Sequence, residues 1–299
     1  MITKSDRYIG CLLGLACADA VGTTVEFSPR GTFTPLTDMV GDGPFHLQVG
    51  EWTDDTSMAL CLAQSLIHKQ GFDAVDQMER YCNWMRHGYM SSNGVCFDIG
   101  NTVSQALNNF LSKGEPYSGS TDPWTAGNGS IMRLAPVSMF YGSDVAKTIH
   151  FSGESSKTTH GAEECVDACK LMGAMLYVAL RGGSKDEILA TDLYQPATPK
   201  IQAIAAGAYQ TESVDRIRGS GYVVDSLKAA LWCFARTDSF RDAVLQAANL
   251  GDDADTTAAV CGQIAGAFYG QTGIPSGWRA KVVMRAEIEE MALALLDSA

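Results

Sequence analysis

The chain lacks any CxxC pair, although nine cysteines are spread over its 299 residues. Most of these cysteines lie among apolar residues, and their odd number would leave at least one unpaired. A disulfide framework is therefore not expected. Buried free thiols are typical of proteins from a reducing compartment, so we expect a cytoplasmic protein.

A long apolar run is also missing near the N-terminus. Residues 9–17 (IGCLLGLAC) are apolar but too short to span a membrane. Lys4 and Arg7 are the only positive charges before this run, Asp19 and Glu26 follow it, and no good cleavage site appears. We expect no membrane span, and these features favour a cytoplasmic protein over one with a secretory leader.

Positive charge is scarce. The chain has 22 Lys and Arg against 34 Asp and Glu, which gives a formal net charge of −12. This balance argues against nucleic acid or an anionic membrane as the main partner. A nucleotide-like ligand stays compatible with it, because such a ligand needs only a local pocket.

Sustained strand-type alternation is missing as well, and the best strand candidate is the short segment 45–49 (FHLQV). Apolar residues recur at helical spacing in four segments: 53–69, 161–181, 222–236 and 278–297. Clusters of Gly, Pro and Ser predict loops at 28–35, 112–123 and 271–277, and none of them is long or polar enough to be a domain linker. We find no internal repeat. Residues 1–299 are thus predicted to form one all-α domain.

Two acidic segments, residues 53–56 (TDDT) and 252–256 (DDADT), stand directly before apolar helical runs. Asp and Thr at such positions accept hydrogen bonds from the free amides of a helix start, and capping alone explains one or two of them. Each segment has more Asp and Thr than a cap needs. The other interpretation is a cation site that both segments share.

A cation site fits the residue types. Four Asp side chains held close together oppose folding unless they are neutralised. Oxygen ligands select hard cations such as Mg²⁺, Mn²⁺ or Ca²⁺ over zinc, and neither segment contains His or Cys. Small residues then follow Thr256, and we expect them to let another helix approach closely; they are Ala258, Ala259, Gly262, Ala265 and Gly266.

Seven segments in order resemble the ADP-ribosylglycohydrolase family, which includes the dinitrogenase reductase-activating glycohydrolase. They are GCLLGLACADAVGTTVEF (10–27), WTDDTSM (52–58), CFDIGNT (96–102), GNGSIMRLAPV (127–137), SSKTTHG (155–161), GSGYVVDSL (219–227) and GDDADTTAAVCGQIAGAFYG (251–270). The resemblance implies a compact all-α domain, an orthogonal multi-helix bundle with two Mg²⁺ or Mn²⁺ ions in a cleft. One departure is Asp252, at a position that is often Gly in the family.

The resemblance also implies the metal site. Its ligands would be Thr53, Asp54, Asp55, Asp253, Asp255 and Thr256. Glu26 would lie beside the metals, either as a ligand or as the carboxylate that activates water. Asp255 is expected to share in catalysis.

Each candidate substrate-binding residue has two interpretations from the sequence alone, and the family resemblance favours one of them. The glycine-rich start of 127–130 is typical of a phosphate-binding helix start or of a plain turn. Tyr222 is either a core residue or an aromatic wall for adenosine, and His160 is either structural or part of the pocket. The resemblance favours substrate contact for Gly127, Asn128, Gly129, Ser130, Ser155, Thr159, His160, Gly221 and Tyr222.

Asp98 bears on the acceptor. A loop Asp often forms a local turn, but a carboxylate at the mouth of a cleft can also receive a guanidinium through paired charge-assisted hydrogen bonds. The resemblance implies that Asp98 binds the arginine of an ADP-ribosylated protein, with ADP-ribose as the product. The alternatives are an immunity protein that neutralises an ADP-ribosylating toxin by occlusion as well as hydrolysis, and a metal-dependent phosphohydrolase acting on a nucleotide-type substrate.

Overall fold

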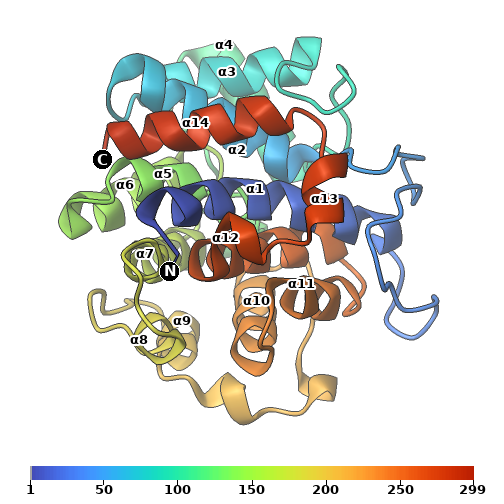
Figure 1. Ribbon diagram of the computed structural model, residues 1–299. Helices are drawn as coiled ribbons and strands as arrows, with labels where there is room; N and C mark the ends of the chain where they lie inside the picture. The colour runs from blue at the N-terminus through green and yellow to red at the C-terminus, as the bar shows by residue number, and fades with distance from the viewer. Residues whose placement is uncertain (1) are drawn as a thin grey trace.

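The computed structural model describes residues 2–299 and is a bundle of helices (Figure 1). Within these residues it has fourteen α-helices and no strand. They are α1 (Lys4–Gly22), α2 (Asp54–Lys69), α3 (Ala74–His87), α4 (Asn101–Lys113), α5 (Ala135–Phe140), α6 (Val145–Lys157), α7 (Glu163–Leu180), α8 (Lys185–Leu189), α9 (Pro199–Ala205), α10 (Val223–Arg236), α11 (Phe240–Ala248), α12 (Ala254–Gly273), α13 (Ser276–Lys281) and α14 (Arg285–Asp297). Short 3₁₀ turns are η1 (Thr23–Val25), η2 (Pro123–Thr125), η3 (Ala208–Thr211) and η4 (Val214–Arg216). The predicted all-α class is confirmed.

Helices α1 and α12 lie side by side through the middle of the bundle (Figure 1). Their contact depends on small residues, because a Cβ at Gly262 would lie 2.5 Å from the carbonyl oxygen of Gly14. A Cβ at Gly14 would lie 2.7 Å from the carbonyl oxygen of Gly262. The expectation that the small residues after Thr256 admit a neighbouring helix is therefore confirmed, and this contact holds the start of α12 against the end of α1.

Helix α1 is longer than the apolar run at 9–17 suggested. With η1 it forms the stretch Lys4–Val25, which by length and composition alone could cross a membrane. However, 94% of its most apolar window is buried by the rest of the chain. Its apolar character is explained by its place in the core, where the buried side chains of most helices join one continuous cluster.

Three of the predicted helices are present as α2, α7 and α10. The fourth prediction, one helix over 278–297, is wrong because the chain turns at Met284, whose φ of 54° is left-handed, and so divides α13 from α14. The strand at 45–49 is also wrong: this segment is a turn closed by paired backbone hydrogen bonds between Asp42 and Leu47. The loop predicted at 271–277 is mostly helical, since α12 and α13 occupy its two ends.

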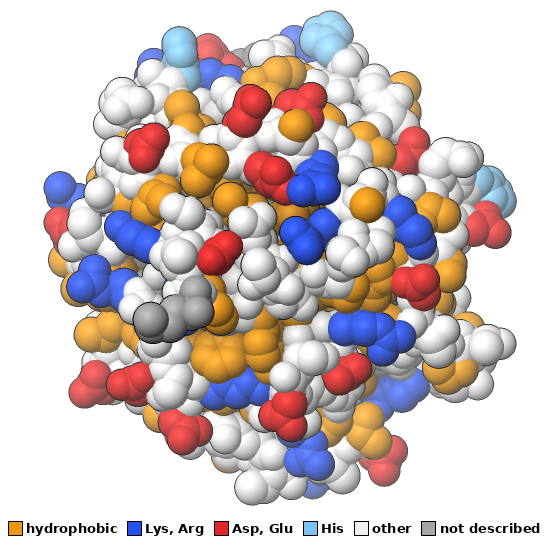
Figure 2. All heavy atoms as spheres, in the orientation of Figure 1, with side chains coloured by type: hydrophobic (Ala, Val, Ile, Leu, Met, Phe, Trp, Pro, Cys, Tyr) orange, Lys and Arg blue, Asp and Glu red, His pale blue; other side chains and the backbone are white. Residues whose placement is uncertain are grey.

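The surface face seen in Figure 2 has acidic and basic side chains interspersed, with apolar side chains between them. No large patch of one sign covers that face.

Candidate functional site

The two acidic segments converge although about 200 residues separate them. Thr53 is the N-cap residue of α2 and Asp253 that of α12, but neither side chain makes a capping hydrogen bond. The first turns of both helices instead face one point. One carboxylate oxygen from each of Asp54, Asp55 and Asp255 lies within 4.8 Å of the others. Helix N-termini carry partial positive charge, which favours carboxylates at this place.

A second group of carboxylates adjoins the first and shares Asp255 with it. Its other members are Glu26 and Asp98, with their oxygens again within 4.8 Å of one another. Glu26 follows η1 at the end of α1, and Asp98 lies in the loop between α3 and α4 with a left-handed φ of 58°. Asp255 thus belongs to both three-carboxylate groups, an arrangement that suits a pair of neighbouring cations.

Asp19 is a functional neighbour that the sequence analysis did not identify. This fully buried carboxylate of α1 accepts hydrogen bonds from the backbone N–H and the hydroxyl of both Thr53 and Thr56, at 2.6–3.1 Å. It therefore satisfies the free amides at the start of α2 and fixes that helix against α1. The available signal was a lone carboxylate inside an apolar helix, which is costly unless it is hydrogen-bonded.

Threonine hydroxyls connect the two clusters. The Thr53 hydroxyl, which donates to Asp19, also lies 3.1 Å from an oxygen of Asp255, and Thr256 donates to an oxygen of Asp55 at 3.3 Å. Each hydroxyl thus links one helix start to the carboxylate of the other. Both threonines are buried, so these contacts are shielded from water.

The ionised form of these carboxylates is unfavourable unless a positive charge lies beside them. Burial, reinforced by neighbouring carboxylates, raises the pKa values of Asp54, Asp55 and Asp255 well above the usual range. The same causes raise the pKa of Glu26 to about 9 and that of Asp98 to about 7.

Two atoms of this site also lack a protein partner. Glu26 Oε2 and Asp55 Oδ1 are buried and have no hydrogen-bond partner among the described residues. Buried carboxylate oxygens need a donor or a cation. The all-oxygen donor set with two free acceptor atoms fits hard divalent cations.

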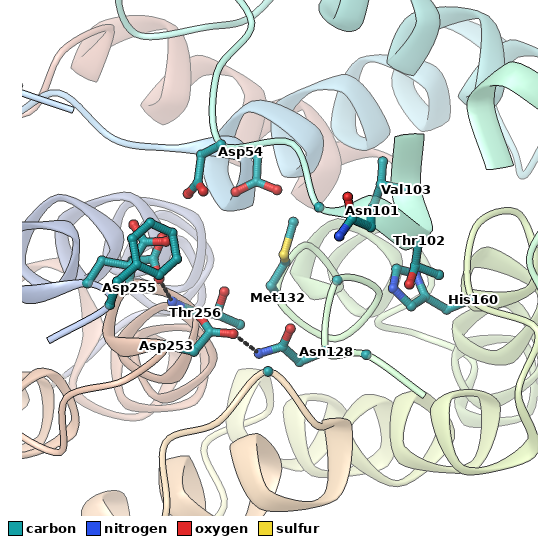
Figure 3. Close-up of a pocket in the computed structure, with 17 residues that line it drawn as sticks. Asp54, Asn101, Thr102, Val103, Asn128, Met132, His160, Asp253, Asp255 and Thr256 are labelled. Carbon is teal, nitrogen blue, oxygen red and sulfur yellow. Dashed lines mark hydrogen bonds between the residues drawn. The ribbon is translucent and has the colours of Figure 1, made fainter. Parts of the chain in front are cut away.

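A cleft of about 390 Å³ opens beside the carboxylates. Figure 3 shows Asp54, Asp253 and Asp255 on one side of it and Asn101, Thr102 and His160 on the other. Its lining includes these predicted site residues: Glu26, Asp54, Asp98, Gly127, Asn128, Gly129, His160, Gly221, Asp253, Asp255 and Thr256. It also includes residues that the sequence analysis did not select: Phe27, Gly100, Asn101, Thr102, Val103 and Met132.

The glycine-rich segment is tied to the carboxylate side of the cleft. Asn128 donates its side-chain amide to Asp253 at 3.0 Å, a contact drawn in Figure 3. The backbone N–H of Asn128 donates to the carbonyl of Gly221, and that of Val223 donates to the carbonyl of Ala126. The predicted phosphate-binding segment and the segment before α10 therefore form one wall.

His160 is buried at the opposite wall and is neutral, because burial lowers its pKa to about 3, with a further contribution from Arg133. The hydroxyl of Thr159 accepts a hydrogen bond from the Arg133 guanidinium at 2.7 Å and lies 2.9 Å from Nδ1 of His160. Since the guanidinium can only donate, we assign Nδ1 as the acceptor for the hydroxyl hydrogen of Thr159. Nε2 then carries the ring proton and lies next to Gly127 and Gly129.

Three predicted substrate contacts lie behind the cleft wall. Thr159 contacts His160 and Arg133, as above. The hydroxyl of Ser130 accepts hydrogen bonds from Ser156 and from the thiol of Cys169, and the hydroxyl of Ser155 accepts one from Gln77. None of the three lines the cleft in the described structure.

Arg133 is fully buried and donates to the carbonyls of Gly129 and Ser155. Its positive charge therefore lies directly behind the glycine-rich segment.

Tyr222 lines a second cavity of about 610 Å³ next to the cleft, and the two share Thr102, Gly127 and Gly221. Its hydroxyl contacts the carboxylate of Glu164 and the ammonium group of Lys200. Trp124, which is 96% exposed, lines the same cavity.

Asp252 is exposed and belongs to neither carboxylate group, and its backbone pairs with that of Phe27 and Ser28. The extra charge at this position is therefore solvated, while its backbone positions the segment after Glu26.

Comparison with known proteins agrees with this geometry. The ADP-ribosylglycohydrolase family model matches residues 1–299. The chain is 49% identical over 294 residues to the ADP-ribosylarginine hydrolase Tri1 of Pseudomonas putida (strain GB-1), covering 98% of this chain and 79% of that protein. It is 32% identical to the ADP-ribosyl-[dinitrogen reductase] glycohydrolase of Rhodospirillum rubrum, covering 95% and 92%.

A solved structure described as an ADP-ribosylglycohydrolase-related protein complex superimposes with a TM-score of 0.86 at 40% identity, covering 99% of this chain and 98% of that chain. The fold, the convergent carboxylates and these similarities lead to one conclusion: the chain belongs to the ADP-ribosylglycohydrolase family of hydrolases.

Proposed function

We propose that this enzyme hydrolyses the bond between ADP-ribose and an arginine side chain of a modified protein. The observation that carries the proposal is the pair of three-carboxylate groups sharing Asp255 beside a cleft. The similarity to Tri1 proteins from two bacteria, at 49% and 47% identity, favours arginine as the acceptor over the occlusion and phosphohydrolase alternatives.

Two divalent cations, Mg²⁺ or Mn²⁺, fit the site. Asp54, Asp55 and Asp255 would hold one of them, and Asp255 would share in the other with Glu26 beside it. Thr53, Asp253 and Thr256 complete the proposed set of oxygen donors. When bound, such cations orient the ribose hydroxyls and lower the pKa of a bound water.

The carboxylates are suited to stabilise the positive charge that develops on the substrate during cleavage. Cleavage at the anomeric carbon builds positive charge on the ribose ring. Preorganised negative groups such as Asp255 stabilise that charge without reorganising. Glu26, whose Oε2 is buried and free, is placed either to complete the cation site or to take the proton of the attacking water. Asp98 faces the acceptor side of the cleft and would receive the guanidinium.

The other half of the substrate would lie against the second wall. The backbone N–H of Gly129 and the Nε2–H of His160 suit a diphosphate, because they are uncharged donors in front of the buried Arg133. The N–H groups of Gly127 and Asn128 already donate to the carbonyls of Thr125 and Gly221. Adenosine would then extend into the cavity at Tyr222, where an aromatic face can stack. We also propose a cytoplasmic location, which is supported by the free state of all nine cysteines.

Substituting Asp255→Ala tests this proposal. Release of ADP-ribose from an arginine-linked substrate should fall by at least about 1,000-fold, since one residue serves both cation groups. EDTA should have the same effect on the unsubstituted enzyme, and excess Mn²⁺ should reverse it.

Ser298→Ala, at the far end of α14, is the matched control and should keep full activity. Full activity of Asp255→Ala in EDTA would contradict the proposal, as would release of phosphate or AMP in place of intact ADP-ribose.

A further inference from the structure

Three aromatic side chains form a row beside the acceptor end of the cleft. The ring centroids of Phe27 and Phe45 are 6.1 Å apart, and those of Phe45 and Phe97 are 5.3 Å apart. Phe27 lines the cleft and is 65% exposed, whereas Phe45 and Phe97 are half-buried and lie outside the cleft lining. The row thus continues from the cleft onto the surface.

The orientation of the cleft decides what reaches this row. Tyr222 and Trp124 line only the second cavity, while Glu26, Phe27 and Asp98 line only the first. If adenosine occupies the cavity at Tyr222, the acceptor leaves the enzyme past Phe27 and Asp98. Whatever is attached to the modified arginine is therefore brought against the aromatic row.

The segments that carry the row are fixed to the catalytic elements. Phe27 has a left-handed φ of 61°, and its backbone N–H donates to the carbonyl of Asp252 at 2.7 Å. Phe45 stands in the turn closed between Asp42 and Leu47. The hydroxyl of Thr24 holds that turn by donating to the carbonyl of Gly41 at 2.9 Å. The row is therefore presented in a constant position relative to Glu26.

The charges of these segments favour a cationic polypeptide. Asp42 and Asp98 are acidic, and His46, in the same turn, contacts Asp42 at 3.2 Å. The one arginine of the segment 27–50, Arg30, is occupied by the carbonyls of Leu250, Val214 and Ile217. Aromatic faces attract guanidinium and ammonium groups and also bury apolar side chains. Free ADP-ribosylarginine ends at the amino and carboxylate groups of its own α-carbon, so it has no neighbouring residues to place against Phe45.

We propose that Phe27, Phe45 and Phe97 form a docking surface for the polypeptide on either side of the modified arginine. The surface would select protein substrates with basic and apolar residues next to the modified site. This inference rests on the proposed function, because it assumes an arginine-linked acceptor.

The test compares two substrates, an arginine-linked ADP-ribosylated protein and free ADP-ribosylarginine. Phe45→Ala should lower kcat/KM for the protein substrate about tenfold, mainly through KM, as is typical when an aromatic contact residue is truncated. Hydrolysis of free ADP-ribosylarginine should stay unchanged, which also shows that the variant is folded. Phe45→Tyr, which keeps the ring, should retain both activities, and so should Val75→Ala, which removes an exposed side chain from α3.

Two results would overturn the docking surface: an equal loss on both substrates in Phe45→Ala, or no loss on the protein substrate. A different result overturns the proposed function, namely that the unsubstituted enzyme releases ADP-ribose from neither substrate.

Discussion

The hydroxyl of Thr159 shows how a residue outside the cleft can act on the ligand. It accepts from Arg133 and donates to Nδ1 of His160, so that the Nε2 proton of His160 lies beside the glycine-rich segment. The sequence analysis placed Thr159 in the pocket itself, because no pattern in the segment 155–161 distinguishes a side chain on the cleft surface from one directly behind it.

Replacing this hydroxyl should weaken ligand binding. In Thr159→Val, Nδ1 loses its donor and the ring is free to change tautomer, so the Kd for ADP-ribose should rise about tenfold, equivalent to about 1.4 kcal/mol. Thr159→Ser keeps the hydroxyl and should restore the affinity. Calorimetry measures both, and ¹⁵N shifts of His160 report the tautomer. An unchanged ring spectrum in Thr159→Val would refute the assignment.

Single residues also differ in how far the sequence reveals them. Asp54, Asp55, Asp253 and Asp255 could be predicted as neighbours because each helix start has more carboxylates than a cap needs. Asp19 could not, since one carboxylate in an apolar helix has no partner in its own segment. Glu26 was selected only through the family resemblance, because a Glu is ordinarily expected at the surface, whereas this one is buried.

The paired helices α1 and α12 position the site through their glycines. Adding a methyl group at Gly262 forces it against the carbonyl of Gly14 and the side chain of Ala18, each 2.5 Å from the new Cβ. Gly262→Ala should therefore destabilise the protein by about 1–3 kcal/mol. Because α1 carries Asp19 and α12 carries Asp255, the same change should also weaken cation binding.

Urea unfolding and a metal titration check this prediction. Gly277→Ala is the matched control: it lies in α13, a Cβ there meets nothing within 4 Å, and alanine favours helix. It should keep or slightly raise the stability. Equal free energies of unfolding for the two variants would contradict the prediction, because they would mean that α1 and α12 can move apart without loss of stability.

Among the elements, α2, α7 and α10 could be predicted because their apolar residues recur at helical spacing over three or more turns. The division of α13 from α14 could not be predicted, since Met284 adopts a left-handed conformation, which methionine rarely does. The turn at Phe45 alternates apolar and polar residues like a strand, but the pairing of Asp42 with Leu47 closes it on itself.

The stability of the whole molecule should depend on pH and metal together. The folded chain raises the pKa of Glu26 to about 9 and that of Asp98 to about 7, from ordinary values of 4.5 and 3.8. Folding thus favours the protonated carboxyls. Their contribution to stability is fully present below about pH 4 and is lost as pH rises through 7 and then 9.

Without metal, the Tm should therefore fall between pH 6 and pH 9. Added Mn²⁺ should raise the Tm more at pH 8 than at pH 6, because fewer protons compete for the same oxygens. Thermal scans over this range measure both effects. Asp98→Asn should flatten the metal-free profile around pH 7, and a Mn²⁺ effect that is constant with pH would contradict the origin of the dependence.

Eight of the nine cysteines are buried, and Cys96 alone is partly accessible. It directly precedes Phe97 and Asp98 in the loop that reaches the acceptor end of the cleft. A thiol-reactive fluorophore or spin probe would therefore attach at one place without any engineering of the chain. The signal of a probe on Cys96 would then report, in real time, the binding and release of a modified protein by the unsubstituted enzyme.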